Sequence, residues 1–89
     1  MNCCDRVIPA SRALEIARNA LASDYRFVDP HYLTIDVIGV RYEACVWDVR
    51  LRVTLDLGSG RMTVSTHLIQ VDACTGEIVG HVLEDHFLV

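Results

Sequence analysis

The longest regular alternation of apolar and polar residues in the chain runs from Cys45 to Leu57. Because neighbouring side chains of a strand point to opposite faces of a sheet, this period of two predicts one long β-strand with one buried face. The apolar positions are Cys45, Trp47, Val49, Leu51, Val53, Leu55 and Leu57. Alternation over 33–37 predicts a preceding strand that ends near Gly39.

Before these strands, apolar residues recur at helical spacing, at Ala13, Leu14, Ala17, Ala20 and Leu21. The pattern predicts an amphipathic helix that begins near Pro9, has Ser11 as its N-cap and closes at Ser23-Asp24. Since most of the stripe is alanine, the helix axis can approach a sheet closely. We therefore expect the stripe to meet the odd-numbered face of the long strand.

After the long strand, Gly58-Ser59-Gly60 predicts a tight turn into a third strand. That strand begins with Met62 and Val64 at even positions and finishes with Ile69 and Val71 at odd positions. A strand needs an extra residue to change the face that it buries, so we expect a β-bulge or a sharp bend near His67-Leu68.

The residues 69–80 read as strand, turn and returning strand. In the turn, Asp72 can accept backbone N–H groups, Thr75 can assist, and Gly76 can adopt a positive φ. A fourth strand through Ile78 should follow, and then an apolar tail that docks on its own core or on a neighbour.

One helix followed by four strands predicts an α+β fold, with an N-terminal helix packed on a four-stranded antiparallel meander sheet in two layers. Its 89 residues form a single domain, with residues 1–9 as an N-terminal arm and 83–89 as the C-terminal tail.

Composition narrows the function classes. The net charge of −4 disfavours a nucleic-acid partner, and no apolar run reaches the ~20 residues that a membrane-spanning helix needs. No signal peptide is visible, so we expect a cytoplasmic protein, or an exported one if a leader has been removed. Without a signal, the four cysteines are expected to be reduced thiols.

Three segments together resemble the PepSY domain: the helical stretch 13–21, the tryptophan strand 46–49 and the hairpin 71–80. The resemblance spans roughly residues 10–82. PepSY domains occur in propeptides of thermolysin-type metalloproteases and in small bacterial exported or membrane-attached proteins, and they are associated with binding and inhibiting peptidases. The resemblance implies a fold, related to cystatin-like proteins, and it carries over no catalytic residue.

Metal, cofactor and catalytic motifs are weak. No C-x₂₋₄-C spacing accompanies His31, His67, His81 and His86, so we expect no metal site and no cofactor. His81 and His86, near a strand end and in the tail, are expected to be solvent-exposed. Cys45 is expected in the core and Cys74 in the turn, with no motif that would place a base beside either thiol. The terminal Cys3-Cys4 pair is expected to be disordered or to join two chains.

The remaining feature is a polar sheet face on which Arg41, Arg50, Arg52 and Arg61 are expected to cluster with Asp48 and Asp56 between them. Cross-strand ion pairs on a solvated face are one interpretation. The other is a surface for an acidic or extended peptide, with Arg50 and Arg52 as principal contacts, or an edge strand that accepts a partner strand.

The sequence therefore predicts a non-enzymatic protein-binding module, an inhibitor or regulatory partner. A self-associating accessory or immunity-type protein, as a homodimer, is the alternative. A thiol- or histidine-dependent enzyme is the least favoured.

Overall fold

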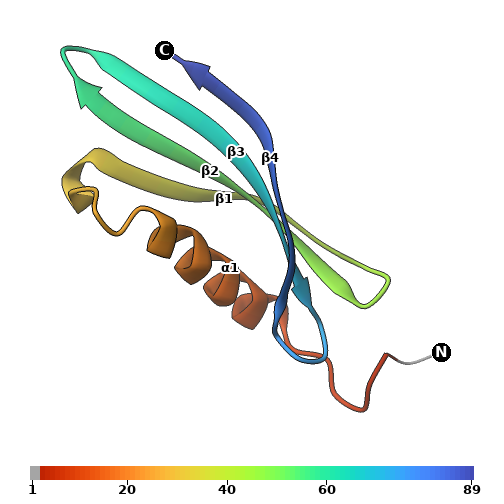
Figure 1. Ribbon diagram of the computed structural model, residues 1–89. Helices are drawn as coiled ribbons and strands as arrows, with labels where there is room; N and C mark the ends of the chain where they lie inside the picture. Colours follow the sequence, from red (N-terminus) through yellow and green to blue (C-terminus); the bar gives the residue numbers. More distant parts are fainter. Residues whose placement is uncertain (1–2) are drawn as a thin grey trace.

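The computed structural model describes residues 3–89 as one helix on a four-stranded antiparallel sheet (Figure 1). The strands lie in the order β1-β2-β3-β4, so the predicted α+β meander is confirmed. The elements are α1 (Ala10–Asp24), the 3₁₀ turn η1 (Pro30–Tyr32), β1 (Leu33–Glu43), β2 (Val46–Gly58), β3 (Arg61–Asp72) and β4 (Ile78–Leu88).

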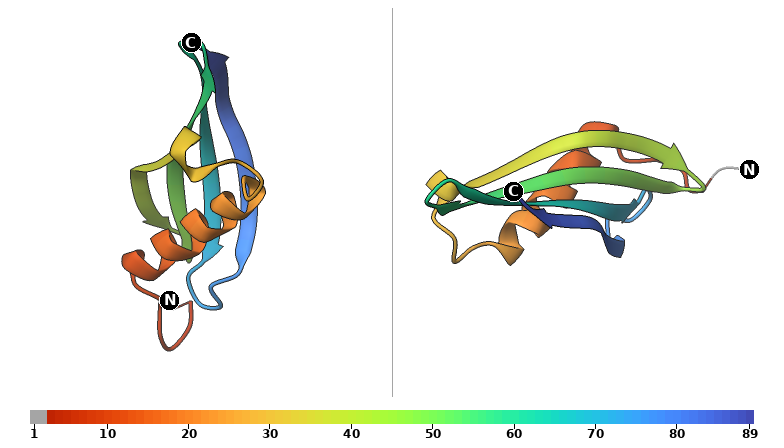
Figure 2. Two further views of the ribbon diagram at one scale, coloured as in Figure 1. Left: turned by 90° about the vertical axis from the view of Figure 1, so that its left-hand side faces the viewer. Right: turned by 90° about the horizontal axis from the view of Figure 1, so that it is seen from above.

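The core lies between α1 and the middle of the sheet, which Figure 1 shows as two separate layers; in both views of Figure 2 the helix overlaps the strands that it covers. Ala13 and Ala17 are fully buried, which lets the helix backbone come close to the strands. As expected, they pack on the odd-numbered face of β2, where Val49 and Leu51 are also fully buried. The helix packs mainly on β1, β2 and β3.

The start of α1 differs from the prediction. Pro9 is the N-cap residue and no side chain caps the helix, so the assignment of Ser11 as N-cap is wrong. The carbonyl of Pro9 accepts the amides of Arg12 and Ala13, which places Ser11 inside the first turn. The helix ends at Asp24, as predicted.

β1 extends to Glu43, past the predicted end at Gly39. The cause is an extra residue, Ile38: Val37 pairs with Leu51 and Gly39 already pairs with Arg50. A bulge shifts every following side chain by one position, so the simple alternation stops at Ile38 although the strand continues.

β3 carries no extra residue at His67-Leu68, although the pairing of β3 with β4 does shift between Thr66 and His67. β3 pairs with β2 without interruption from Met62 to Asp72, and the extra residue is Glu84, on β4. The apparent change of face has another cause. The helix-facing positions of β3 include the polar residues Ser65 and His67, while Met62 lies on the opposite face.

The cysteines overturn the expectation of reduced thiols. Cys3 is bonded to Cys45 and Cys4 to Cys74, with Cα–Cα distances of 5.7 and 5.9 Å. Cys45 lies in the β1–β2 turn with a φ of +66°, so its predicted core position is wrong too.

The two disulfides fasten the N-terminal arm to two hairpin turns at one end of the sheet. The amide of Ile8 also donates to the carbonyl of Ala73 at 2.8 Å, and the indole of Trp47 donates to the carbonyl of Ile8 at 3.0 Å. Residues 3–8 are therefore tied to the domain, although they form no strand. The expected arm also included residues 1 and 2, which lie outside the described residues.

The segment expected as a tail, 83–89, continues β4 as far as Leu88. Val89 and Met62 then exchange two backbone hydrogen bonds, at 2.7 and 3.1 Å. Within residues 3–89, the structure has no helix with the length and hydropathy to span a bilayer.

Candidate functional site

The four arginines expected as one cluster are spread along the sheet. Arg41 pairs in register with Asp48, near the β1–β2 turn, whereas Arg61 pairs with Gly58, at the far end of β2. Ten residues of strand separate these partners, a span of roughly 33 Å at 3.3 Å per residue. The predicted four-residue cluster is therefore wrong.

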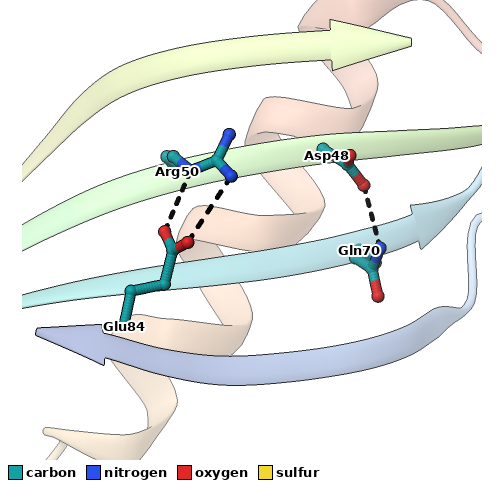
Figure 3. A network of polar contacts seen from close by, with 4 residues as sticks. All are labelled: Asp48, Arg50, Gln70 and Glu84. Carbon is teal, nitrogen blue, oxygen red and sulfur yellow. Dashed lines mark hydrogen bonds and ion pairs between the residues drawn. The ribbon is translucent and has the colours of Figure 1, made fainter. Parts of the chain in front are cut away.

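Arg50 and Arg52 do lie on the face of the sheet turned away from the helix, which we call the outer face. There the guanidinium of Arg50 donates to both carboxylate oxygens of Glu84, at 2.9 and 3.5 Å (Figure 3). Beside it, the amide of Gln70 donates to Asp48 at 3.0 Å. The charge of Arg50 is thus compensated from within the chain, by the residue that forms the β4 bulge.

The structure places Asp72, Thr75 and Gly76 together in the β3–β4 turn. One carboxylate oxygen of Asp72 accepts the amides of Cys74 and Thr75, at 2.8 and 2.9 Å. Both hydrogen bonds lower the pKa of Asp72, and the bond from the amide of Thr75 has the larger effect. Gly76 has a φ of +77°, which glycine adopts without a steric penalty. The three residues shape a turn.

β4 carries a feature that the sequence indicated only at its C-terminal end, as the apolar tail. Six large apolar side chains of this strand are exposed, and they occupy both faces of the sheet. We call them the β4 surface: Ile78, Val79, Val82, Leu83, Phe87 and Leu88. β4 is also an edge strand, which pairs only with β3 among the strands of residues 3–89. The bulges at Val79 and Glu84 break its alternation, so the pattern that would have assigned its faces is hidden.

A second unexpected feature is a chain of three polar side chains on the helix-facing side of β3 and β4. Ser65 and His67 are 6% and 8% exposed, and they are the buried polar residues of the described chain. Nε2 of His67 lies 3.0 Å from the hydroxyl oxygen of Ser65, and Nδ1 of His67 lies 2.9 Å from Nε2 of His81. The predicted exposure of His81 and His86 is confirmed, whereas the burial of His67 was not predicted.

Burial lowers the pKa of His67, and the charge of the neighbouring His81 lowers it further. Asp24, at the end of α1, acts in the opposite direction, and His86 adds a smaller lowering effect. The lowered pKa favours the neutral imidazole, in which one ring nitrogen donates and the other accepts, and both nitrogens of His67 have partners in Ser65 and His81.

Ser65, His67 and His86 border an open depression of about 200 Å³ beside the C-terminal end of α1. Because Ser65 is so little exposed, its hydroxyl orients His67 rather than facing the solvent. The chemistry that the arrangement supports is that of imidazole, namely proton exchange and metal ligation. The lining consists of Tyr25, Leu55, Thr63, Ser65, His67, Leu83 and His86.

Comparison with known proteins returned no matching family model, no matching curated protein and no matching solved structure.

Proposed function

We propose that this chain is a non-enzymatic binding module that engages a protein or an extended peptide through β4. The observation that carries the proposal is the β4 surface, six exposed apolar side chains on one edge strand. A free edge strand with exposed apolar side chains on both faces is typical of a contact surface, because soluble proteins usually blunt or cover such edges. An inhibitor or a regulatory partner, as the PepSY resemblance implies, would use it in the same way.

The binding mode that fits this strand is strand addition. The free edge of β4 presents backbone N–H and C=O groups that an extended segment of the partner can pair with as a fifth strand. Main-chain hydrogen bonds would supply much of the affinity. The apolar side chains would give selectivity on both faces, since Val82 lies on the outer face and Leu83 on the helix-facing one.

Charge favours a partner other than a second copy. Glu84 and Asp85 are adjacent near the middle of β4, and antiparallel pairing of two β4 strands about that point would bring four carboxylates together. Like charges on neighbouring strands destabilise the pairing. Arg50 neutralises Glu84 only, so a partner strand with a basic residue opposite Asp85 fits better.

The proposal is tested by selecting extended peptides from a library against the disulfide-bonded protein, and by measuring how two matched variants bind them. Val82→Lys alters β4 at a side chain that is 50% exposed, and Val40→Lys makes the same change on the other edge strand, at 38% exposure. We expect Val82→Lys to weaken binding at least tenfold and Val40→Lys to leave it nearly unchanged. Equal effects of the two variants would contradict the assignment of β4.

The expected contacts Arg50 and Arg52 form a second part of the test. Because Arg50 is already paired with Glu84, we propose that Arg52 is the more available of the two for an acidic group of the partner. Charge reversal at Arg52 should then weaken binding more than charge reversal at Arg50. Unchanged binding in both variants would remove the outer face from the proposal.

Self-association is the second candidate function, because the same β4 surface could be covered by a second copy in a homodimer. Sedimentation at micromolar concentration separates the two functions. A concentration-dependent dimer that Val82→Lys abolishes would favour self-association, and a persistent monomer would eliminate it.

We also propose that the protein works in an oxidising compartment, in place of the cytoplasmic location expected from the sequence. Two disulfides support this location, because protein disulfides are rare in reducing compartments. Alkylation of the freshly isolated protein, followed by mass spectrometry, should find no reactive thiol. Quantitative labelling of the four cysteines would contradict the proposal.

A further inference from the structure

We propose that His67 and His81 form a chelating site for a divalent transition metal, with Cu²⁺ as the best fit. The two facing nitrogens, Nδ1 of His67 and Nε2 of His81, lie 2.9 Å apart. With metal–nitrogen bonds of about 2.0–2.1 Å, this separation corresponds to an N–metal–N angle of about 90°. The inference is independent of whether β4 binds a protein.

The angle discriminates between metals. Two neighbouring ligands of a square-planar Cu²⁺ or Ni²⁺ ion subtend about 90°, whereas a tetrahedral Zn²⁺ site would hold its nitrogens about 3.3 Å apart. Of Cu²⁺ and Ni²⁺, Cu²⁺ binds nitrogen ligands more tightly in the usual order of divalent-metal affinities.

Ser65 supplies the support that such a site needs. Its hydroxyl lies 3.0 Å from Nε2 of His67, so the far ring nitrogen has its own partner while Nδ1 faces His81. Metal-binding histidines usually make such a bond with the second nitrogen, which fixes the tautomer and the ring orientation. Ser65 is therefore a positioning residue for the pair.

The protonation state and the access route agree with this role. Without metal, one proton between the two facing nitrogens satisfies both. When the metal binds, that proton leaves the facing nitrogen and the same ring takes up a proton at its other nitrogen. Both rings therefore stay neutral and ligate through their facing lone pairs, with no net release of a proton. His81 is exposed on β4, so the metal can enter from the solvent.

The site offers two protein ligands and leaves the other positions to water. Across residues 3–89, no group of three or more histidine, cysteine or carboxylate side chains converges on one point. The four cysteines are held in disulfides and present no thiol that would reduce Cu²⁺. We therefore expect a single Cu²⁺ per chain, bound at micromolar concentration.

The experiment is a Cu²⁺ titration of the disulfide-bonded protein, followed by electron paramagnetic resonance. The variant is His81→Gln, which changes an exposed side chain and should leave the fold intact, as the melting temperature without metal will show. The matched control is His31→Gln, since His31 is also exposed and lies in η1, away from the pair.

We expect the native protein and His31→Gln to bind one Cu²⁺ with equal affinity and with a signal from two imidazole nitrogens. His81→Gln should bind at least tenfold more weakly, with a signal from one. Equal affinity of the native protein and His81→Gln would overturn the proposal and leave the two histidines as a hydrogen-bonded pair only. Loss of binding in His31→Gln would overturn it as well.

Discussion

Removal of the Cys4–Cys74 disulfide by the double substitution Cys4→Ala and Cys74→Ala should destabilise the domain strongly. This bond joins residues 70 positions apart, and the Cys3–Cys45 bond joins residues 42 positions apart. If the loss of chain entropy in the unfolded state is the cause, each bond alone would be worth about 4 kcal/mol.

The two bonds are not independent, because Cys3 and Cys4 are adjacent. With Cys3–Cys45 intact, the Cys4–Cys74 bond closes only the loop from Cys45 to Cys74, about 30 residues long. Closing a loop of this length contributes slightly less than about 4 kcal/mol to the free energy of unfolding. Measured effects commonly fall below this model, so we expect a loss of about 3 kcal/mol. For a domain of this size, that corresponds to a fall in Tm of more than about 10 °C.

The assay is urea unfolding followed by the fluorescence of Trp47, whose indole lies against the arm. Native protein with intact disulfides is compared with the double variant. The matched control is Cys3→Ala with Cys45→Ala, which removes the other bond and should cost a similar amount. A loss below about 1 kcal/mol for Cys4→Ala with Cys74→Ala would refute the reasoning, since the bonds to Ile8 alone would then hold the arm.

Three further predictions concern pH and backbone strain. Because the pKa of His67 is lowered in the fold, the unfolded chain takes up a proton at a higher pH than the folded one. The free energy of unfolding should therefore fall as the pH drops below about 6.5. Thermal melts across this range should show a smaller fall in stability for His67→Gln. The lowered pKa of Asp72 acts at more acid pH: its stabilising effect is present above a pH of about 4 and is lost as the pH falls through the native pKa. The variant Asp72→Asn should therefore flatten the acid end of the same stability profile. An unchanged profile would contradict the role of the hydrogen bonds that Asp72 accepts from the backbone. Ala44 has a φ of +52°, so Ala44→Gly should stabilise the domain by about 0.5–1 kcal/mol in urea unfolding. This figure is the left-handed strain that glycine relieves minus the extra conformational entropy that glycine gives the unfolded chain. A destabilised variant would contradict this balance.

The predictable part of the fold rests on two strong local patterns. Alternation over the long strand and the alanine-rich stripe each point to one element with one buried face, and the meander follows from the short turns between strands. The hairpin at Asp72 was equally accessible, because its hydrogen bonds are local in sequence.

The parts that could not be predicted depend on contacts between distant residues. A bulge at Ile38 or Glu84 exists only relative to the partner strand, so the single-strand pattern does not show it. The disulfides join residues that the fold brings together at one end of the sheet.

The candidate sites were missed for the same reason. The burial of His67 follows from where the C-terminal end of α1 lies over β3, and its pairing with His81 follows from the register of β4. One sequence signal was available: Ser65 and His67 have the same parity as Ile69 and Val71, so they could have been recognised as polar residues on the buried face.

The most direct test of β4 as the binding surface is hydrogen–deuterium exchange of the disulfide-bonded protein, with and without a selected peptide. Strand addition predicts that the amides of residues 78–88 gain protection, while those of β1, at the opposite edge, exchange at unchanged rates. Protection confined to β1, or to the strands that carry Arg50 and Arg52 with β4 unaffected, would contradict the account.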